Sequence, residues 1–389
     1  MPSVFVTSPA ILTGVGAFSE LGSRTASLGR KVLLVTGRKG LRQAGVTDRA
    51  LTLLGRAGCS VIPFEEVAGE PDLAVCDRGR QILRQEDCQV VVALGGGSAL
   101  DAGKVMAGLA GHTEPTLEFW NGKAVIAPGV PFVSVPTTAG TGSEVTNNGV
   151  ITNPDKRAKK SIRDERFVAR VALVDPELTV TCPPEITAYA GMDALCQAIE
   201  SFTSRHATPL TDALALAAVE LLADGLLAAW REPEDLEART RNSLGALMAG
   251  MALTNARLGL VHGLAHPLGA RFGIAHGLVC SVLLPHVMEL NRPFAIAKYR
   301  QLDHLLGGHC LDRIRQLMEK IRIPDDLRAY RIPPTLFPVI IDEALPSGST
   351  AANPKKVTPE DARQVLVAAC GIKSRDGHPS RPSPDMDQE

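Results

Sequence analysis

Three of the nine histidines of this 389-residue chain lie between positions 262 and 276. His262 and His266 are four residues apart, so on a helix both rings project from the same face. Pro267 and Gly269 follow, and we expect the chain to turn back there and bring His276 towards the other two. Neutral imidazole is a common ligand of zinc and of iron(II). Histidines hydrogen-bonded to backbone carbonyls are the alternative, but three rings in so short a stretch favour a metal site.

A metal site of this kind usually includes an anionic ligand, and the sequence offers Asp193 for that role. Its neighbours, Ala-Gly-Met before it and Ala-Leu-Cys after it, are apolar. A carboxylate in such surroundings needs a cation or hydrogen-bond donors to stay ionised. The dipole at the N-terminus of a helix can meet the same need, so the spacing alone leaves both interpretations open.

Two polar loops follow apolar runs in the first half of the chain. The first loop comprises Gly95, Gly96, Gly97 and Ser98. Glycines let the backbone approach a pyrophosphate, and a helix beginning near Ala99 offers free N–H groups and a favourable dipole. Ser98 is expected to cap that helix and to donate to a phosphate oxygen. A tight strand-to-helix turn without a ligand is the alternative.

The second loop, residues 136–144, also follows an apolar run and contains two glycines. Its four hydroxyl side chains are those of Thr137, Thr138, Thr141 and Ser143. Hydroxyl groups at this density fit a surface that hydrogen-bonds ribose and phosphate. Two such loops at the ends of adjacent parallel strands define a crevice, and a dinucleotide is the simplest ligand that needs both.

The elements that must position these residues indicate two domains. The predicted strands are residues 31–36, 60–64, 90–94 and 132–135. They are short, apolar and separated by helical segments such as residues 49–57, which predicts a parallel sheet covered on both faces. Ala- and Leu-rich segments follow, and the predicted helices there are residues 193–201, 209–230, 238–256 and 295–306.

We therefore predict a Rossmann-like, dinucleotide-binding α/β domain with a parallel sheet over residues 1–180. An all-helical metal- and substrate-binding domain is expected over residues 181–370. The tail, residues 371–389, is rich in Ser, Pro, Asp and Gly and is predicted to be disordered.

Composition excludes several classes of partner. The formal net charge is −1 and the sequence has no basic stripe with interleaved aromatics, so we expect no nucleic-acid partner. Three acidic residues interrupt the most apolar stretch, residues 210–230, which predicts a buried helix and no membrane span. The N-terminus lacks a secretory signal, and the eight cysteines form no CxxC pair, so a cytoplasmic protein with reduced thiols is expected.

From about residue 9 to residue 370 the sequence resembles the iron-containing (group III) alcohol dehydrogenase family. The motifs are Gly95-Gly-Gly-Ser-Ala-Leu-Asp101-Ala-Gly-Lys104, residues 136–144, Ala190-Gly-Met-Asp193-Ala-Leu, residues 262–277, Leu283-Leu-Pro-His286-Val and Asn353-Pro-Lys-Lys. The resemblance implies a dinucleotide-binding domain, a helical domain, a metal in the cleft between them, and a homodimer. Asp101 is included among the predicted cofactor contacts.

The resemblance also implies individual roles. The family's metal ligands match Asp193, a histidine four residues later, His262 and His276. His266 matches a non-ligand histidine near the nicotinamide that is often assigned to proton transfer, a task for which the ordinary pKa range of imidazole is suited. Lys160 resembles the family's cofactor-contacting lysine.

One ligand position departs from the family pattern, because Gln197 stands four residues after Asp193. Its amide oxygen is a weaker and neutral donor. Either Gln197 coordinates weakly, or the site becomes an Asp/His/His site completed by water, as in the similar glycerol dehydrogenases, which favour zinc. Three protein ligands and an open position suit catalytic Zn²⁺, whereas the family name argues for Fe²⁺.

The choice of nicotinamide cofactor depends on Gly37. NAD-dependent relatives often carry an aspartate at this position, which hydrogen-bonds the adenosine ribose and repels a 2′-phosphate. Gly37 opens that space, and Arg38 and Lys39 add positive charge beside it. A solvated turn is the alternative, but we favour NADP(H) over NAD(H).

These features predict a metal-dependent, NAD(P)-linked alcohol dehydrogenase or aldehyde reductase. Hydride would pass between C4 of the nicotinamide and the carbon of a small alcohol or aldehyde, with one Fe²⁺ or Zn²⁺ as Lewis acid. One alternative is a lyase or cyclase on the same scaffold, like the dehydroquinate synthases, although the helical domain supplies few of the basic residues that its phosphorylated substrates need. The other is an inactive dinucleotide-binding relative in which Gln197 marks a decaying metal site.

Overall fold

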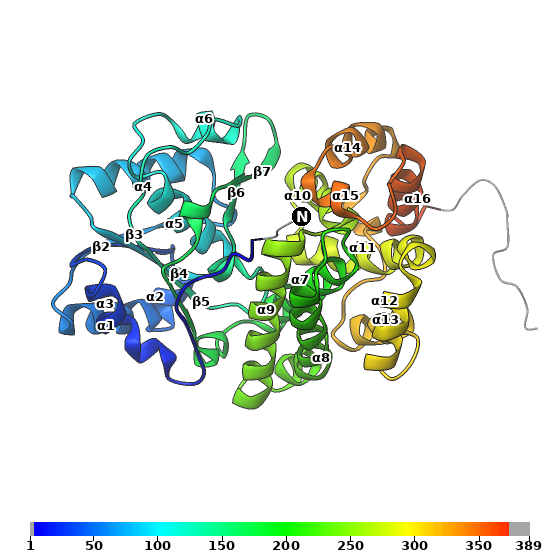
Figure 1. Ribbon diagram of the computed structural model, residues 1–389, viewed down its shortest axis with the longest axis horizontal. Coiled ribbons are helices and arrows are strands. Elements are labelled where there is room, and N and C mark those ends of the chain that lie inside the picture. The colour runs from blue at the N-terminus through cyan, green and yellow to red at the C-terminus, as the bar shows by residue number, and fades with distance from the viewer. Residues whose placement is uncertain (1–3, 373–389) are drawn as a thin grey trace, which may run out of the picture.

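The computed structural model describes residues 4–372, so most of the tail predicted to be disordered lies outside the described residues. The first half of the chain forms a sheet covered by helices, and the second half is built of helices that pack beside it (Figure 1). This arrangement confirms the predicted fold class.

A six-stranded sheet with the order β1-β8-β5-β4-β2-β3 forms the centre of the first half, and its paired strands all run parallel. Its strands are β1 (Ile11–Thr13), β2 (Lys31–Gly37), β3 (Ser60–Val67), β4 (Val90–Gly95), β5 (Phe132–Pro136) and β8 (Val171–Val174). The four predicted strands are present. The sequence analysis missed the short strands β1 and β8, and it also missed the hairpin formed by β6 (Asn148–Asn153) and β7 (Ala158–Arg163).

Helices cover both faces of the sheet because its strands are apolar on both sides. They are α1 (Leu21–Ala26), α2 (Gly40–Gln43), α3 (Val46–Arg56), α4 (Leu73–Gln85), α5 (Gly97–Gly108) and α6 (Thr116–Trp120). Side chains of alternate strand residues pack with α4 and α5 on one face, and the intervening ones pack with α1 and α3 on the other. This two-sided burial is what an α/β sheet requires.

The second half holds ten helices among the described residues. They are α7 (Pro184–Thr203), α8 (Pro209–Arg231), α9 (Leu236–Ala256), α10 (Leu260–Phe272), α11 (His276–Asn291), α12 (Ile296–Leu305), α13 (Cys310–Lys320), α14 (Phe337–Ala344), α15 (Gly348–Ala352) and α16 (Pro359–Ala369). All of them except the short α15 contribute apolar side chains to one continuous core. The last strand of the sheet, β8, ends at Val174, and the first long helix, α7, begins at Pro184. We propose that the boundary between the two domains lies in this connection, where residue 180 was predicted.

Helix α8 covers the apolar stretch that the sequence analysis assigned to a buried helix. It is long and apolar enough to cross a membrane by length and composition alone. In the structure it packs against α7 and α9, and its eight buried residues lie on one face of the helix. The prediction of a buried helix therefore holds for that face only.

Candidate metal and cofactor site

The histidine cluster is built by two consecutive helices. His262 and His266 lie on α10, as predicted, but the expected turn at Pro267 and Gly269 was wrong because α10 runs through both residues to Phe272. The chain turns afterwards, where Gly273 caps α10 with a φ of 64°. His276 then begins α11, and its ring centroid lies 5.4 Å from that of His262.

Asp193 joins these rings from α7. Its Oδ1 lies 3.2 Å from His262 Nε2 and 3.6 Å from His276 Nε2. The side chains of Asp193 and His262 are 3% exposed, whereas that of His276 is 28% exposed. The cluster is therefore reached from solvent on the His276 side.

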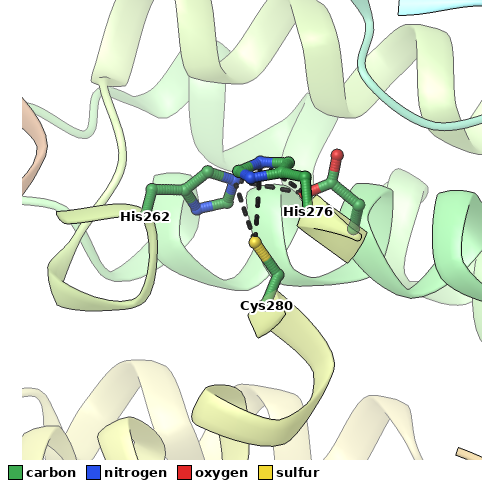
Figure 2. A group of neighbouring side chains, drawn as sticks. His262, His276 and Cys280 are labelled. Atoms are coloured by element: carbon green, nitrogen blue, oxygen red, sulfur yellow. Dashed lines mark hydrogen bonds and ion pairs between the residues drawn. The ribbon is translucent and has the colours of Figure 1, made fainter. Parts of the chain in front are cut away.

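A fourth donor, which the sequence analysis missed, is Cys280 on α11. Figure 2 shows the side chains of His262, His276 and Cys280 directed towards one another. Together with Asp193 they offer four ligand atoms that all lie within 4.8 Å of one another. One carboxylate, two imidazoles and a thiol are all groups that bind divalent metals, so the residues present fit a metal ion.

Gln197, at the position of the family's fourth ligand, hydrogen-bonds Asp193. Its Nε2 donates to Asp193 Oδ2 at 2.9 Å, the carboxylate oxygen that is not directed at the histidines. Its Oε1 is buried and finds no hydrogen-bond partner among the described residues. The amide thus holds Asp193 in place through its N–H₂ group.

Glu200, also missed by the sequence analysis, contacts His262 on the side of the ring opposite Asp193. It lies on α7, and its Oε2 is 2.6 Å from His262 Nδ1, the ring nitrogen that faces away from Asp193. Its Oε1 accepts the N–H of Val261 at 2.7 Å. A carboxylate on the outer nitrogen fixes the tautomer and raises the basicity of a metal-binding histidine. The spacing of seven residues from Asp193, two turns of one helix, could have indicated it.

The electrostatics of the cluster are those of a cation site. Burial lowers the pKa of His276, but Cys280 and Asp193 outweigh it and raise that pKa to about 9. Burial raises the pKa of the Cys280 thiol, but a hydrogen bond from Cys196 and the two histidines hold it well below its usual range. Buried negative groups that hold protons on imidazoles in this way also favour a metal ion.

His266 behaves differently from the other two rings. Its centroid lies 5.5 Å from that of His276. Burial first, and then the positive charges of His276 and His262, lower the pKa of His266 to about 3. The expectation of a pKa suited to proton relay near neutral pH is therefore wrong for this arrangement, because the ring stays neutral.

The cofactor loops meet at one edge of the sheet. Leu94 of β4 pairs with Thr36 of β2, and Gly95 of β4 pairs with Pro136 of β5, so the segments that follow these three strands are neighbours. Gly96, Gly97 and Ser98 are partly exposed there. Helix α5 begins at Gly97 with Gly96 as its cap, so the predicted capping role of Ser98 was wrong.

The two loops pack directly against each other. A Cβ on Gly97 would lie 2.5 Å from Thr141 Cγ2, so a larger residue would push the loops apart. Thr138 and Thr141 are partly exposed, whereas Thr137 and Ser143 are buried. Of the four predicted hydroxyl groups, two thus remain on a surface where a ligand can reach them.

Ser143 and Asp101 bind each other. Ser143 Oγ donates to Asp101 Oδ1 at 2.5 Å, and the N–H of Val150 donates to Asp101 Oδ2 at 2.9 Å. Lys104, which is fully buried, adds hydrogen bonds to the carbonyl of Ser143 and to Thr146 Oγ1, each at 2.7 Å. Burial lowers the pKa of Lys104 to about 8. These contacts join the second loop to α5 and to the hairpin.

Lys160 on the hairpin lies over an aromatic ring. Its Nζ lies 4.2 Å from the centroid of the Trp120 ring. The side chain of the neighbouring Lys159 is instead buried, pairs with Glu70, and reaches α10, where its Nζ is 3.3 Å from the position of a Cβ on Gly269. The sequence analysis missed Lys159 because it did not predict strand β7, in which neighbouring side chains such as those of Lys159 and Lys160 point to opposite faces.

At the end of β2 the structure leaves room beside Gly37. The nearest atom to an added Cβ is the carbonyl oxygen of Val67, at an ordinary contact distance of 3.6 Å. Arg38 and Lys39 follow and are exposed. Gly37 and Arg38, the residues predicted to select the cofactor, thus lie at the same edge of the sheet as the glycine loop.

Comparisons with known proteins identify the family of this chain. Residues 8–176 match the family model described as iron-containing alcohol dehydrogenase, and residues 187–370 match that described as Fe-containing alcohol dehydrogenase family, C-terminal. The chain belongs to the iron-containing alcohol dehydrogenase family, as its motifs indicated.

Individual relatives are similar over nearly their whole length. A 1,3-propanediol dehydrogenase of Citrobacter freundii is 35% identical over 370 residues, covering 92% of this chain and 96% of the relative. An NAD-dependent methanol dehydrogenase of Bacillus methanolicus is 31% identical over 377 residues, covering 94% and 99%. The crystal structure of a 1,3-propanediol oxidoreductase matches with a TM-score of 0.91 at 35% identity, covering 95% of this chain and all of that one.

Proposed function

We propose that this protein is a metal-dependent, nicotinamide-linked alcohol dehydrogenase or aldehyde reductase. The observation that carries the proposal is the convergence of Asp193, His262 and His276 in a buried cluster that opens to solvent on one side. The relatives' names, which refer to 1,3-propanediol and methanol, support a small alcohol, diol or aldehyde as the substrate.

Asp193, His262 and His276 would hold the ion, and Glu200 would orient His262. A bound divalent metal supplies Lewis-acid polarisation of the substrate oxygen, and a bound nicotinamide accepts or delivers the hydride. His266, neutral and next to His276, can hydrogen-bond the substrate hydroxyl and hold it in position.

The glycine loop, Thr138 and Thr141 would bind the dinucleotide at the ends of β4 and β5. Three other predicted contacts, Thr137, Ser143 and Asp101, would hold these loops in shape, since their side chains are buried or bonded to protein. The room beside Gly37 and the charge of Arg38 support a preference for NADP(H), whereas the family as a whole implies NAD(H). The cofactor preference is therefore tested separately from the reaction.

We also propose that the protein is a homodimer and that it acts in the cytoplasm.

Metal analysis of protein purified without added metal, followed by an NADPH- and NADH-coupled aldehyde screen, tests this function. We expect stoichiometric metal and net oxidation of the reduced cofactor, which a lyase would not produce. His262→Ala and His276→Ala should lose the metal, whereas His266→Ala should keep it and lose rate. Full activity after removal of the metal by a chelator would refute the proposal.

A further inference from the structure

The position of Cys280 decides how the departure at Gln197 is compensated. Cys280 follows His276 by one turn of α11, so both side chains leave the helix on the same face. Its Sγ lies 3.6 Å from His276 Nε2 and 3.9 Å from His262 Nε2. Figure 2 shows the sulfur directed at the two ring nitrogens.

These separations can be compared with those that a metal imposes on its ligands. Zinc–nitrogen bonds of about 2.0–2.1 Å and a zinc–sulfur bond of about 2.3 Å, at tetrahedral angles, place N and S about 3.6 Å apart and N and O about 3.4 Å apart. The observed Sγ–Nε2 distances are 3.6 and 3.9 Å, and the Nε2–Oδ1 distances are 3.2 and 3.6 Å. Four of the six separations between the donors therefore match the edges of one coordination sphere, and all six are within 4.8 Å.

Gln197 is a poorer candidate for the fourth corner. Its N–H₂ group already donates to Asp193 Oδ2, and an amide nitrogen that donates a hydrogen bond is not a metal ligand. Its Oε1 is buried without a hydrogen-bond partner among the described residues, but a neutral amide oxygen is a weaker ligand than a thiolate. The sulfur of Cys280 already lies among the other donors.

We propose that Cys280 is the fourth protein ligand, so that the chain holds its metal through Asp193, His262, His276 and a thiolate. The inference rests on the metal-dependent function proposed above. Thiolate is a soft ligand that favours zinc over metals that prefer oxygen ligands, and zinc also binds imidazole and carboxylate. The site thus favours Zn²⁺ over Fe²⁺, and a substrate oxygen would enter as a fifth ligand.

Cobalt substitution tests the proposal directly, because a thiolate bound to Co²⁺ gives a charge-transfer absorption that oxygen and nitrogen ligands do not. The metal-free protein would be reconstituted with Co²⁺, and Zn²⁺ affinity would be measured separately by competition with a chromophoric chelator. We expect the wild type to bind one Co²⁺ with the thiolate band. Cys280→Ser and Cys280→Ala should lose the band, with Zn²⁺ affinity at least about tenfold weaker, since even changes outside the first coordination sphere cost that much.

Matched variants separate the possible outcomes. Cys196→Ser removes the neighbouring buried thiol, and Cys76→Ser removes a buried thiol in the other domain; both should keep the band. Gln197→Ala should also keep it. Stoichiometric metal in the wild type without the band, or a band that survives loss of Cys280 or disappears only with Cys196, would overturn this assignment while leaving the proposed function intact. Absence of metal from the wild type would instead refute the proposed function. The wild-type spectrum needs no variant to fold.

Discussion

Replacing Glu200 tests whether the metal ligand His262 depends on the carboxylate behind it. One carboxylate group accepts two hydrogen bonds at the start of α10, from Val261 N at 2.7 Å and at His262 Nδ1, 2.6 Å away. It thereby fixes both the backbone and the ring of the ligand. Gly259 leaves room for it, because a Cβ there would lie 2.6 Å from Glu200 Oε1.

The expected magnitude follows from these contacts. Loss of a carboxylate partner of a metal-binding histidine weakens metal affinity by about 10- to 100-fold, which is roughly 1.4–2.7 kcal/mol. Glu200→Ala also leaves two buried donors without an acceptor, each at a cost of about 1–3 kcal/mol in stability. Glu200→Gln keeps one acceptor oxygen, so its loss of affinity and stability should be smaller.

The assay is a competition for Zn²⁺ against a chromophoric chelator, together with thermal midpoints recorded with and without saturating metal. Glu220→Ala is the control, because Glu220 is an exposed glutamate on α8 of the same domain. Wild-type affinity in Glu200→Ala, or a loss no larger than that of the control, would show that His262 does not need this carboxylate.

Three further predictions concern other parts of the site. Lys159→Ala should raise the pKa of His266, followed by NMR titration of its ring, because the positive charge of Lys159 contributes to lowering that pKa; Lys160→Ala, whose ammonium lies over Trp120, should leave it nearly unchanged. Arg38→Ala should reduce any preference for NADPH over NADH by up to about fivefold, since an exposed ion pair contributes about 1 kcal/mol or less. Burial raises the pKa of Glu144 from 4.5 to about 7, so the stability that its protonated form contributes below pH 4.5 is lost as the pH rises through 7. Glu144→Gln cannot lose a proton, so its free energy of unfolding relative to wild type should increase by roughly 3 kcal/mol from pH 4.5 to pH 7, as measured from unfolding midpoints. Equal effects of the two lysine substitutions, or an unchanged ratio of NADPH to NADH activity in Arg38→Ala, would contradict the first two expectations. Parallel pH profiles of stability for Glu144→Gln and wild type would contradict the third.

The strands that the sequence predicts are those with continuous apolar runs, because burial on both faces imposes that pattern. β1 and β8 have only three and four residues, too few for a pattern to stand out. The hairpin strand β6 alternates between partly exposed and buried residues and follows a loop rich in hydroxyl groups, which hid it. Pro267 was read as a break, but α10 continues through it because the surrounding core buries this part of the helix.

The misses at the metal site have a different cause. His262, His266 and Asp193 were found through residue type and local spacing, and Cys280 was overlooked because the cysteines were judged only by their spacing from one another. The spacing that matters joins unlike residues: His276 and Cys280 are one turn apart on α11, and Asp193 and Glu200 are two turns apart on α7. Helices α7 and α11 thus each supply a pair of side chains to the site. Only the packing of these two helices with α10 shows that the side chains face one another. A donor absent from α7 at Gln197 can therefore be replaced from α11, a substitution between helices that spacing within either helix cannot reveal.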